Sequence, residues 1–170
     1  MKIIGGRYKG LTIDTSKNLS YRPTQSRIRK SIFDIITPFT YSRVLDLYSG
    51  SGILGFESAS RGADSITFVE TNSNSIKMLK RNKSKFEGVE FFMLRKKAFY
   101  FLKSIENKYD LIFADPPYDK LDYTVLMSMC IEKLSKNGKL ILEMSNNSLS
   151  FTNSIERKYG DTKIVIYTKQ

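Results

Sequence analysis

The sequence predicts an α/β fold with a mostly parallel sheet, helices on both of its faces and an antiparallel hairpin at its end. Three observations support this prediction. From residue 43 to 143, short apolar runs alternate with amphipathic segments of helical length. A glycine-rich loop directly follows the first of these runs. The last two runs, 154–159 and 163–168, have no helical segment between them. Repeated βα units imply parallel strands, whereas two consecutive strands form a hairpin.

Each expected element has a local reason in the sequence. The strands are short runs rich in β-branched and aromatic residues, and the helices begin at polar capping residues or end at glycine. Gly62 ends the first helix of the repeat, and Thr71 or Asn72 caps the second. We expect parallel strands at 43–47, 65–70, 89–94, 109–114 and 138–143, and helices at 53–61, 72–83, 98–105 and 120–134.

The first 41 residues precede this repeat and differ from it. Residues 2–4 and 11–13 are expected to form two short strands around the basic turn G-G-R-Y-K-G. Thr24 can cap a helix that ends before Pro38 and whose apolar positions recur at helical spacing. We therefore divide the chain into an N-terminal hairpin and helix, 1–41, and an α/β domain, 42–170.

The composition excludes several classes of function. With 41 % hydrophobic and 26 % charged residues, the chain of 170 residues is typical of a folded soluble protein. No apolar run approaches the roughly 20 residues of a membrane helix, and the start M-K-I-I-G-G does not resemble a signal peptide, so we expect a cytoplasmic protein. The single cysteine, Cys130, is expected in the core, and there is no histidine. Histidine-based catalysis, an internal disulfide and a Cys or His metal site are excluded.

The net charge of +11 is unevenly distributed. Residues 1–43 hold nine Lys or Arg and two acids, a net of +7, and the rest of the chain holds +4. A basic segment of this density indicates a polyanionic partner, nucleic acid before anionic membrane. Solubility and a drift of composition toward lysine are the alternative explanation. The basic cluster at 77–85 is interpreted as a solvated helix face.

The glycine loop D-L-Y-S-G-S-G-I-L-G contains a G-x-G-x-x-G pattern, which taken alone suggests a dinucleotide. Asp46 argues against that ligand, because a carboxylate directly before the loop would repel a pyrophosphate. The sulfonium and ammonium of S-adenosylmethionine are instead attracted by a carboxylate, and Glu70 is spaced to reach ribose hydroxyls. The loop therefore predicts S-adenosylmethionine as cofactor. A glycine-rich turn that binds nothing is the alternative.

The stretch A-D-P-P-Y follows the apolar run 109–114. The amine of a nucleobase is a poor nucleophile, because its lone pair is delocalised into the ring. The Asp115 carboxylate and the Pro116 carbonyl can accept hydrogen bonds from its two N–H groups and aim the lone pair at a methyl donor. The prolines fix the backbone, and Tyr118 offers a ring to stack on a flipped-out base. These residues predict amine methylation by positioning and electrostatics. A rigid surface turn is the alternative.

Taken together, these motifs resemble the RsmD family over nearly the whole length. I-I-G-G-R-Y-K-G is similar to its opening hairpin, R-P-T-Q-S-R-I-R-K-S-I-F to its R-P-T segment, V-L-D-L-Y-S-G-S-G-I-L-G-F-E to its cofactor motif and D-P-P-Y to its catalytic motif. The resemblance implies a Rossmann-like class I S-adenosylmethionine-dependent methyltransferase fold. It implies methylation of a guanine N2 in bacterial 16S ribosomal RNA, free or in a partly assembled small subunit. Residues 1–41 would face the RNA, and we expect a monomer.

The resemblance also assigns candidate residues. The catalytic candidates are Asp115, Pro116, Pro117 and Tyr118. The cofactor-binding candidates are Asp46, Tyr48, Ser49, Gly50, Gly52, Glu70, Ala98 and Asp115. The RNA-binding candidates are Arg22 and Thr24, from the family's R-P-T segment, together with Arg7, Lys9, Arg27 and Arg29, from the basic N-terminal segment, and no metal site is expected.

One position departs from the family pattern. The family usually has an acid before Ala98, where it lies close to the adenine, whereas this chain has Lys97, which cannot accept a hydrogen bond. Three other functions remain open. A DNA adenine-N6 methyltransferase shares the D-P-P-Y chemistry but usually needs an added target-recognition region. An RNA-binding protein with a decayed cofactor site would explain Lys97. A NAD oxidoreductase ranks third, because Asp46 disfavours it.

Overall fold

The computed structural model describes residues 1–15, 26–117, 122–146 and 148–170; Arg22, Thr24 and Tyr118 lie outside the described residues. The strands are β1 (Arg43–Leu47), β2 (Ser65–Glu70), β3 (Glu90–Arg95), β4 (Tyr109–Ala114), β5 (Leu134–Ser145), β6 (Ser154–Tyr159) and β7 (Thr162–Thr168). The helices are α1 (Ser26–Ile35), α2 (Ile53–Ser60), α3 (Ser73–Lys83), α4 (Ala98–Ser104) and α5 (Tyr123–Glu132).

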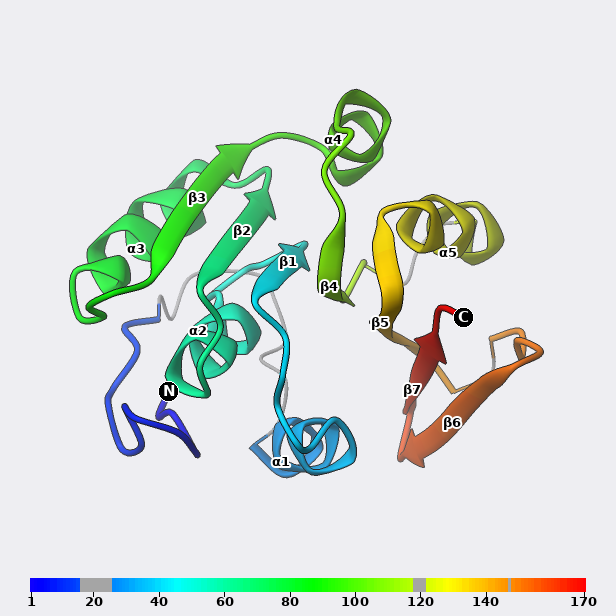
Figure 1. The fold of residues 1–170 in the computed structure, drawn as a ribbon, viewed down its shortest axis with the longest axis horizontal. Helices are drawn as coiled ribbons and strands as arrows, with labels where there is room; N and C mark the ends of the chain where they lie inside the picture. The colour runs from blue at the N-terminus through cyan, green and yellow to red at the C-terminus, as the bar shows by residue number, and fades with distance from the viewer. Residues whose placement is uncertain (16–25, 118–121, 147) are drawn as a thin grey trace.

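A single sheet of seven strands forms the centre of the molecule, in the order β3-β2-β1-β4-β5-β7-β6 (Figure 1). The first five strands are parallel, and β7 runs antiparallel to both β5 and β6. The strand order reverses its direction at β1 and β4, which are neighbours. The predicted α/β fold with a terminal antiparallel hairpin is therefore confirmed.

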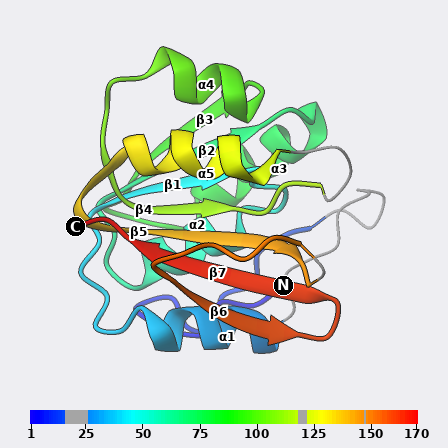
Figure 2. The ribbon, with the colours of Figure 1, turned by 90° about the vertical axis from the view of Figure 1, so that its right-hand side faces the viewer.

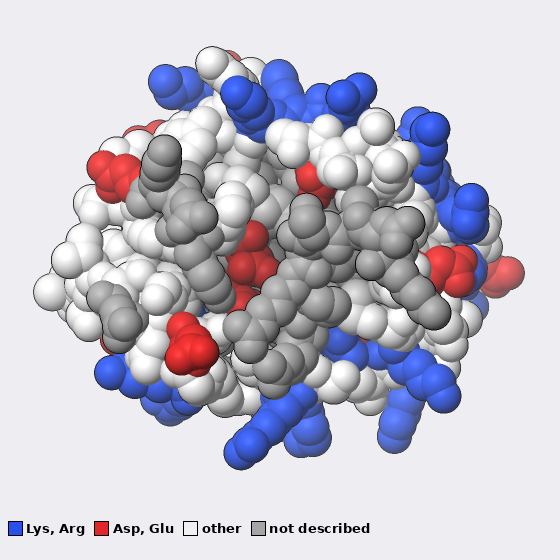
Figure 3. All heavy atoms as spheres, turned by 180° about the vertical axis from the view of Figure 1, so that it is seen from behind, with Lys and Arg blue, Asp and Glu red and all other residues white. Residues whose placement is uncertain are grey.

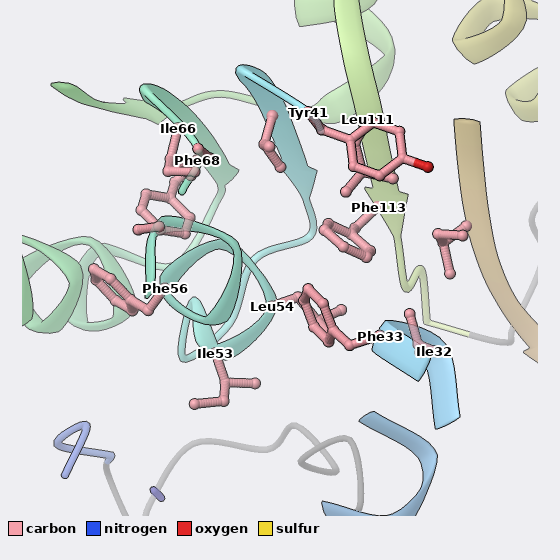
Figure 4. Close-up of a cluster of buried hydrophobic side chains, with 14 of the residues drawn as sticks. Ile32, Phe33, Tyr41, Ile53, Leu54, Phe56, Ile66, Phe68, Leu111 and Phe113 are labelled. Atoms are coloured by element: carbon pink, nitrogen blue, oxygen red, sulfur yellow. The ribbon is translucent and has the colours of Figure 1, made fainter. Parts of the chain in front are cut away.

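Helices cover both faces of the sheet. Figure 2 shows α4 and α5 on one face and α1 and α2 on the other. On the α1 face, the Phe33 ring of α1 lies 5.9 Å from that of Phe113 in β4, and the Phe56 ring of α2 lies 5.0 Å from that of Phe68 in β2 (Figure 4). On the other face, Cys130 of α5 is fully buried, as its place in an apolar pattern predicted.

Strand β5 begins earlier than predicted. Leu134 was expected to end a helix and residues 135–137 to precede the strand, but Leu134 pairs with Tyr109 of β4, and a register shift separates this pair from the regular ladder. Asn137 has a positive φ of 62° and donates its backbone N–H to Lys169 O at 2.9 Å. The prediction for these residues was wrong, because partners from two distant parts of the chain hold them in the sheet.

The N-terminal hairpin is also less regular than predicted. It contains one bridge, between Lys2 and Thr12, in place of two short strands. Its turn is instead bound to α2: Ile4 N–H donates to Glu57 Oε2 at 2.8 Å, and Tyr8 N–H donates to Ser60 Oγ at 2.9 Å. The hairpin therefore has hydrogen bonds to a helix in addition to those between its own two arms, such as Ile3 N–H to Leu11 O at 3.0 Å.

Candidate active site

The loop after β1 turns sharply at the carboxyl end of the sheet. Tyr48, Gly50 and Gly52 all have positive φ, of 56°, 51° and 73°. Ser49 Oγ donates to Asp46 O at 2.6 Å and to Val69 O at 3.2 Å, so the loop is tied to β1 and β2. A Cβ atom on Gly52 would lie 2.3 Å from Leu79 Cδ2 of α3. The loop is therefore fixed in shape, and Gly52 is required by both its conformation and its neighbours.

Asp46 lies near the end of β1, before this loop, and is only 2 % exposed. Its Oδ2 accepts a hydrogen bond from Gly55 N–H at 3.0 Å and so holds the first turn of α2. Burial raises the pKa of the Asp46 carboxyl well above its usual range, and the charges of Asp115 and Glu70 act in the same direction. A cation bound nearby would favour the ionised carboxylate. This agrees with the preference for a cationic cofactor that the sequence predicted.

Glu70 closes the same loop from the end of β2. Its Oε2 accepts Gly50 N–H at 2.8 Å, and its Oε1 accepts Thr71 N–H at 2.7 Å and Asn72 N–H at 2.8 Å. The expected contact between Glu70 and ribose hydroxyls remains a prediction. In the structure, the Glu70 carboxylate joins the loop after β1 to the loop after β2. These two loops would border such a ligand.

Asp115 follows the last residue of β4, and the neighbouring strand contributes a second carboxylate. Because Ala114 pairs with Leu142 of β5, Asp115, directly after β4, lies level with Glu143, which is near the end of β5. Burial raises the pKa of Asp115 to about 8, and the charge of Glu143 contributes. Pro116 is buried and Pro117 is exposed. Asp115 and Pro116 are thus partly enclosed at the strand end, where the sequence predicts that the Asp115 carboxylate and the Pro116 carbonyl bind the amine.

Glu143 was not singled out from the sequence. The signal was present, since the apolar run L-I-L-E ends in an acid as a fifth parallel strand reaches the ligand-binding edge of the sheet. With Glu143, carboxylates lie at or near the carboxyl ends of four neighbouring strands, β2, β1, β4 and β5. Figure 3 shows acidic side chains in the hollow centre of one face of the molecule and Lys and Arg side chains around its rim. A cationic cofactor would meet negative charge at the centre, and a polyanion would meet positive charge at the rim.

Ala98 lies near the other end of this edge, as the first residue of α4, and is 4 % exposed. Lys97 occupies the N-cap position of α4 without a capping hydrogen bond from its side chain, and it is exposed. Among the residues that the structure describes, no cluster of acidic, Cys or His side chains is arranged to hold a metal ion. None of the described helices is long and apolar enough to span a membrane.

The family described as Conserved hypothetical protein 95, which is the RsmD family, matches residues 1–168. The chain belongs to this family. The family resemblance predicted from its motifs is therefore confirmed.

Individual proteins similar to this RsmD-family chain support the same family and fold. The ribosomal RNA small subunit methyltransferase D of Buchnera aphidicola subsp. Baizongia pistaciae is 35 % identical over 153 residues, which cover 89 % of this chain and 74 % of that protein. The Escherichia coli protein yhhF has 23 % identity and a TM-score of 0.88, covering 100 % of this chain and 98 % of that one. The SAM-dependent methyltransferase of Agrobacterium tumefaciens has 19 % identity and a TM-score of 0.69, covering 91 % and 64 %. The expected class I methyltransferase fold is confirmed by these structures.

The described basic candidates of the RsmD-family N-terminus fall into two groups, exposed and buried. Arg7, Lys9 and Arg27 are exposed. Arg7 N–H donates to Ser60 O at the last residue of α2, so the hairpin turn lies at the end of α2 opposite the glycine loop. Arg27 lies in the first turn of α1, which Figure 2 places at the same end of the molecule as the carboxyl ends of the parallel strands.

Arg29 is a correction to the predicted RNA contacts. Its side chain is 1 % exposed, its Nη2 donates to Lys2 O at 2.8 Å, and its Nε lies 3.9 Å from Glu57 Oε2. Arg61 Nε donates to the other oxygen of the same carboxylate at 2.9 Å. Arg29 therefore joins the hairpin to α1 and α2 and does not face solvent. Its charge alone gave no sign of this, because the acid that pairs with it lies 28 residues further along the chain.

Proposed function

We propose that this protein transfers a methyl group from S-adenosylmethionine to the exocyclic N2 amine of a guanine in 16S ribosomal RNA. The observation that carries the proposal is the partly enclosed Asp115 at the end of β4, one strand from the loop that Asp46 and Glu70 hold in place. The name of the Buchnera relative, a ribosomal RNA small subunit methyltransferase, supports the class of substrate.

The residues present fit this cofactor. Asp46 and Glu70 place negative charge beside the glycine loop, whose backbone has positive φ at Gly50 and Gly52. Tyr48, Ser49 and Ala98 complete the proposed binding edge. When bound, S-adenosylmethionine supplies an electrophilic methyl group on a sulfonium. The carboxylates stabilise the positive charge of this ligand at the edge where the amine arrives.

Asp115 has two roles in the proposed reaction. Its carboxylate accepts a hydrogen bond from one N–H of the amine while the Pro116 carbonyl accepts the other, which directs the nitrogen lone pair outward. Methyl transfer leaves the nitrogen with one proton too many, which the ionised Asp115 carboxylate accepts; the positive charge of the bound cofactor favours this ionised form, and burial, which raises the pKa of Asp115, makes it a stronger base. An ordinary aspartate would be a far weaker base. Pro117 keeps Pro116 extended, and Tyr118, outside the described residues, is proposed to stack on the base.

The RNA is proposed to approach the basic N-terminal extension, residues 1–41, through Arg7, Lys9, Arg22, Thr24 and Arg27. Residues 42–170 would form the catalytic domain. We propose that the protein acts as a monomer in the cytoplasm, on RNA that is free or within a partly assembled small subunit.

The test is to incubate the protein with labelled S-adenosylmethionine and, separately, with protein-free 16S ribosomal RNA, assembled small subunits and DNA, and then to map the label. The proposal predicts label on a guanine N2 of the RNA and none on DNA. Label on DNA adenine would assign the chain to the second class of methyltransferase. RNA binding without transfer to any substrate would indicate a decayed cofactor site.

A further inference from the structure

The basic character of this chain is not confined to its N-terminus. Residues 71–105 hold nine Lys or Arg and two acids, a net of +7, which equals the net charge of residues 1–43. The rest of the chain, taken together, has a net charge of −3. All residues of this second basic segment are described, and they form the edge strand β3, the helix α3 that packs against it, and the following helix α4, which lies against β2 and α5 (Figure 1). The charge is thus concentrated at the β3 edge.

One face of this edge also exposes large apolar side chains. Successive side chains of a strand point to opposite faces, so Phe92 and Leu94 of β3 share a face. They are 51 % and 38 % exposed, while Phe91, on the opposite face, is buried against α2 and α3. Helix α4 packs against β2 and α5. It therefore leaves these two side chains accessible.

Lys96 connects this row of side chains with α4. It continues the alternation past the end of β3, and its Nζ donates to Ser104 Oγ at 3.0 Å. Tyr100 lies one helical turn before Ser104 and so on the same side of α4, where it is 62 % exposed, with the exposed Lys103 beside it. We call the five residues Phe92, Leu94, Lys96, Tyr100 and Lys103 the edge patch.

The edge patch is continuous with the candidate active site. The Lys96 backbone N–H donates to Glu70 O at 3.1 Å, and Glu70 holds the glycine loop. On the opposite face of β3, Lys80 and Lys83 of α3 flank a hollow of about 460 Å³ that Phe91 and Met93 also line. An RNA strand that extends from the active site along β3 would therefore meet cations on both sides of the sheet edge.

We propose that the edge patch is a second RNA-docking surface, on which Tyr100 and Phe92 stack with unpaired bases while Lys96 and Lys103 contact phosphates. Exposed rings between cations are the combination that binds single-stranded nucleic acid, because every base has a face that stacks and every nucleotide carries a charge. The net charge of the segment favours a polyanion over a protein partner or a second copy of the chain. This inference rests on the proposed function, and it extends the RNA contact beyond residues 1–41.

The test measures binding of protein-free 16S ribosomal RNA by filter retention over a range of salt concentrations. Tyr100→Ala is expected to weaken binding about tenfold, the loss typical of one stacked base, and Tyr100→Phe, which keeps the ring, is expected to bind as the wild type does. A protein with both Lys96→Gln and Lys103→Gln is expected to lower the salt slope by about 1.4–1.8, because two phosphate contacts are lost. Matched controls on β6, the opposite edge strand, are Ile155→Ala and Lys158→Gln, both at exposed positions.

The outcomes separate this inference from the proposed function. If the wild type methylates RNA while the edge-patch variants bind RNA no more weakly than the β6 variants, the inference is overturned and the proposed function stands. If the wild type neither binds nor methylates RNA, the proposed function fails first. A dimer that dissociates on Tyr100→Ala with unchanged RNA affinity would assign the patch to self-association and also overturn the inference. Calorimetry with S-adenosylmethionine, expected to give unchanged affinity, shows that each variant is folded.

Discussion

Glu70 and Gly50 are joined by a hydrogen bond of 2.8 Å from the Gly50 N–H to Glu70 Oε2, which ties the loop after β1 to the end of β2. The other carboxylate oxygen accepts two further backbone N–H groups, from Thr71 and Asn72. One acidic side chain thus orders two loops at the carboxyl edge of the sheet. A loop held in this way is ordered before a ligand arrives, which lowers the entropic cost of binding.

Replacing Glu70 by glutamine removes one of its two acceptor oxygens and places an amide N–H₂ against backbone N–H groups. A hydrogen bond to a charged group is worth about 1.5–3 kcal/mol. We therefore expect Glu70→Gln to weaken S-adenosylmethionine binding by roughly tenfold to a hundredfold, measured by calorimetry. Glu90→Gln, at an exposed acid at the start of β3, is the control and should bind normally. Equal affinity of the two variants would show that Glu70 does not organise the cofactor site.

Gly52 and Gly88 form a matched pair for testing the tight packing of the glycine loop. Both have a φ of 73°, but a Cβ on Gly52 would lie 2.3 Å from Leu79 Cδ2, while no described atom lies within 4 Å of one on Gly88. Alanine at either position should therefore lose a similar amount of stability through its strained backbone. Only Gly52→Ala also overpacks its surroundings, which should cost a further ~1–3 kcal/mol of stability. Denaturant unfolding should show this difference in stability, and cofactor binding should be lost only in Gly52→Ala. Equal destabilisation of both variants would contradict the packing described for the loop.

Arg27 and Arg29 separate an RNA contact from a structural ion pair. Arg27 is exposed, whereas Arg29 is buried beside Glu57. Arg29→Met should cost about 3 kcal/mol of stability, because it removes one partner of a buried pair. Arg27→Met should change stability by less than about 0.5 kcal/mol and lower the salt slope of RNA binding by about 0.7–0.9. Thermal unfolding and filter binding measure the two effects. A loss of stability in Arg27→Met and a lower salt slope in Arg29→Met would instead show that Arg29 contacts RNA.

The sequence predicted the elements that follow from local pattern, and β2 and β4 have the predicted bounds. It also located Asp46, Glu70 and Asp115, because each ends an apolar run that becomes a parallel strand. It could not show that Arg29 is buried, since that depends on Glu57 from another helix. The early start of β5 likewise depends on Tyr109 and Lys169, which are distant in the chain. The sequence did not indicate the edge patch, because the net charge of +4 over residues 44–170 includes acids of other segments that offset the cations of residues 71–105.

The neighbouring carboxylates Asp115 and Glu143 predict a pH dependence. The pKa of Asp115 is raised from 3.8 to about 8, first by burial and then by the charge of Glu143. Single-turnover methyl transfer should therefore rise with pH as Asp115 loses its proton, with a midpoint at or below about 8, because the cationic cofactor favours the ionised form. Glu143→Gln removes the neighbouring charge and should move the rise to lower pH. Glu132→Gln, at an exposed acid of α5, should leave the profile unchanged.

The same shift affects stability in a defined direction. Between about pH 4 and pH 8 the folded protein keeps the Asp115 proton that the unfolded chain has lost, so this group makes stability fall as pH rises through that range. Asp115→Asn should therefore raise the melting temperature at pH 8 more than at pH 5. A melting temperature that responds equally at both pH values would show that Asp115 has an ordinary pKa.

The most direct test of the account is single-turnover methyl transfer by Asp115 variants to the small-subunit substrate, at saturating cofactor and pH 8. If Asp115 orients the amine, Asp115→Ala should bind S-adenosylmethionine nearly as the wild type does and transfer the methyl group roughly 10²–10³ times more slowly, by analogy with the loss of one preorganised hydrogen-bonding group. Asp115→Asn, which keeps an acceptor oxygen, should be faster than Asp115→Ala. A folded Asp115→Ala protein that transfers methyl groups within about threefold of the wild-type rate would contradict the account, because A-D-P-P-Y would then be a turn and not the amine site.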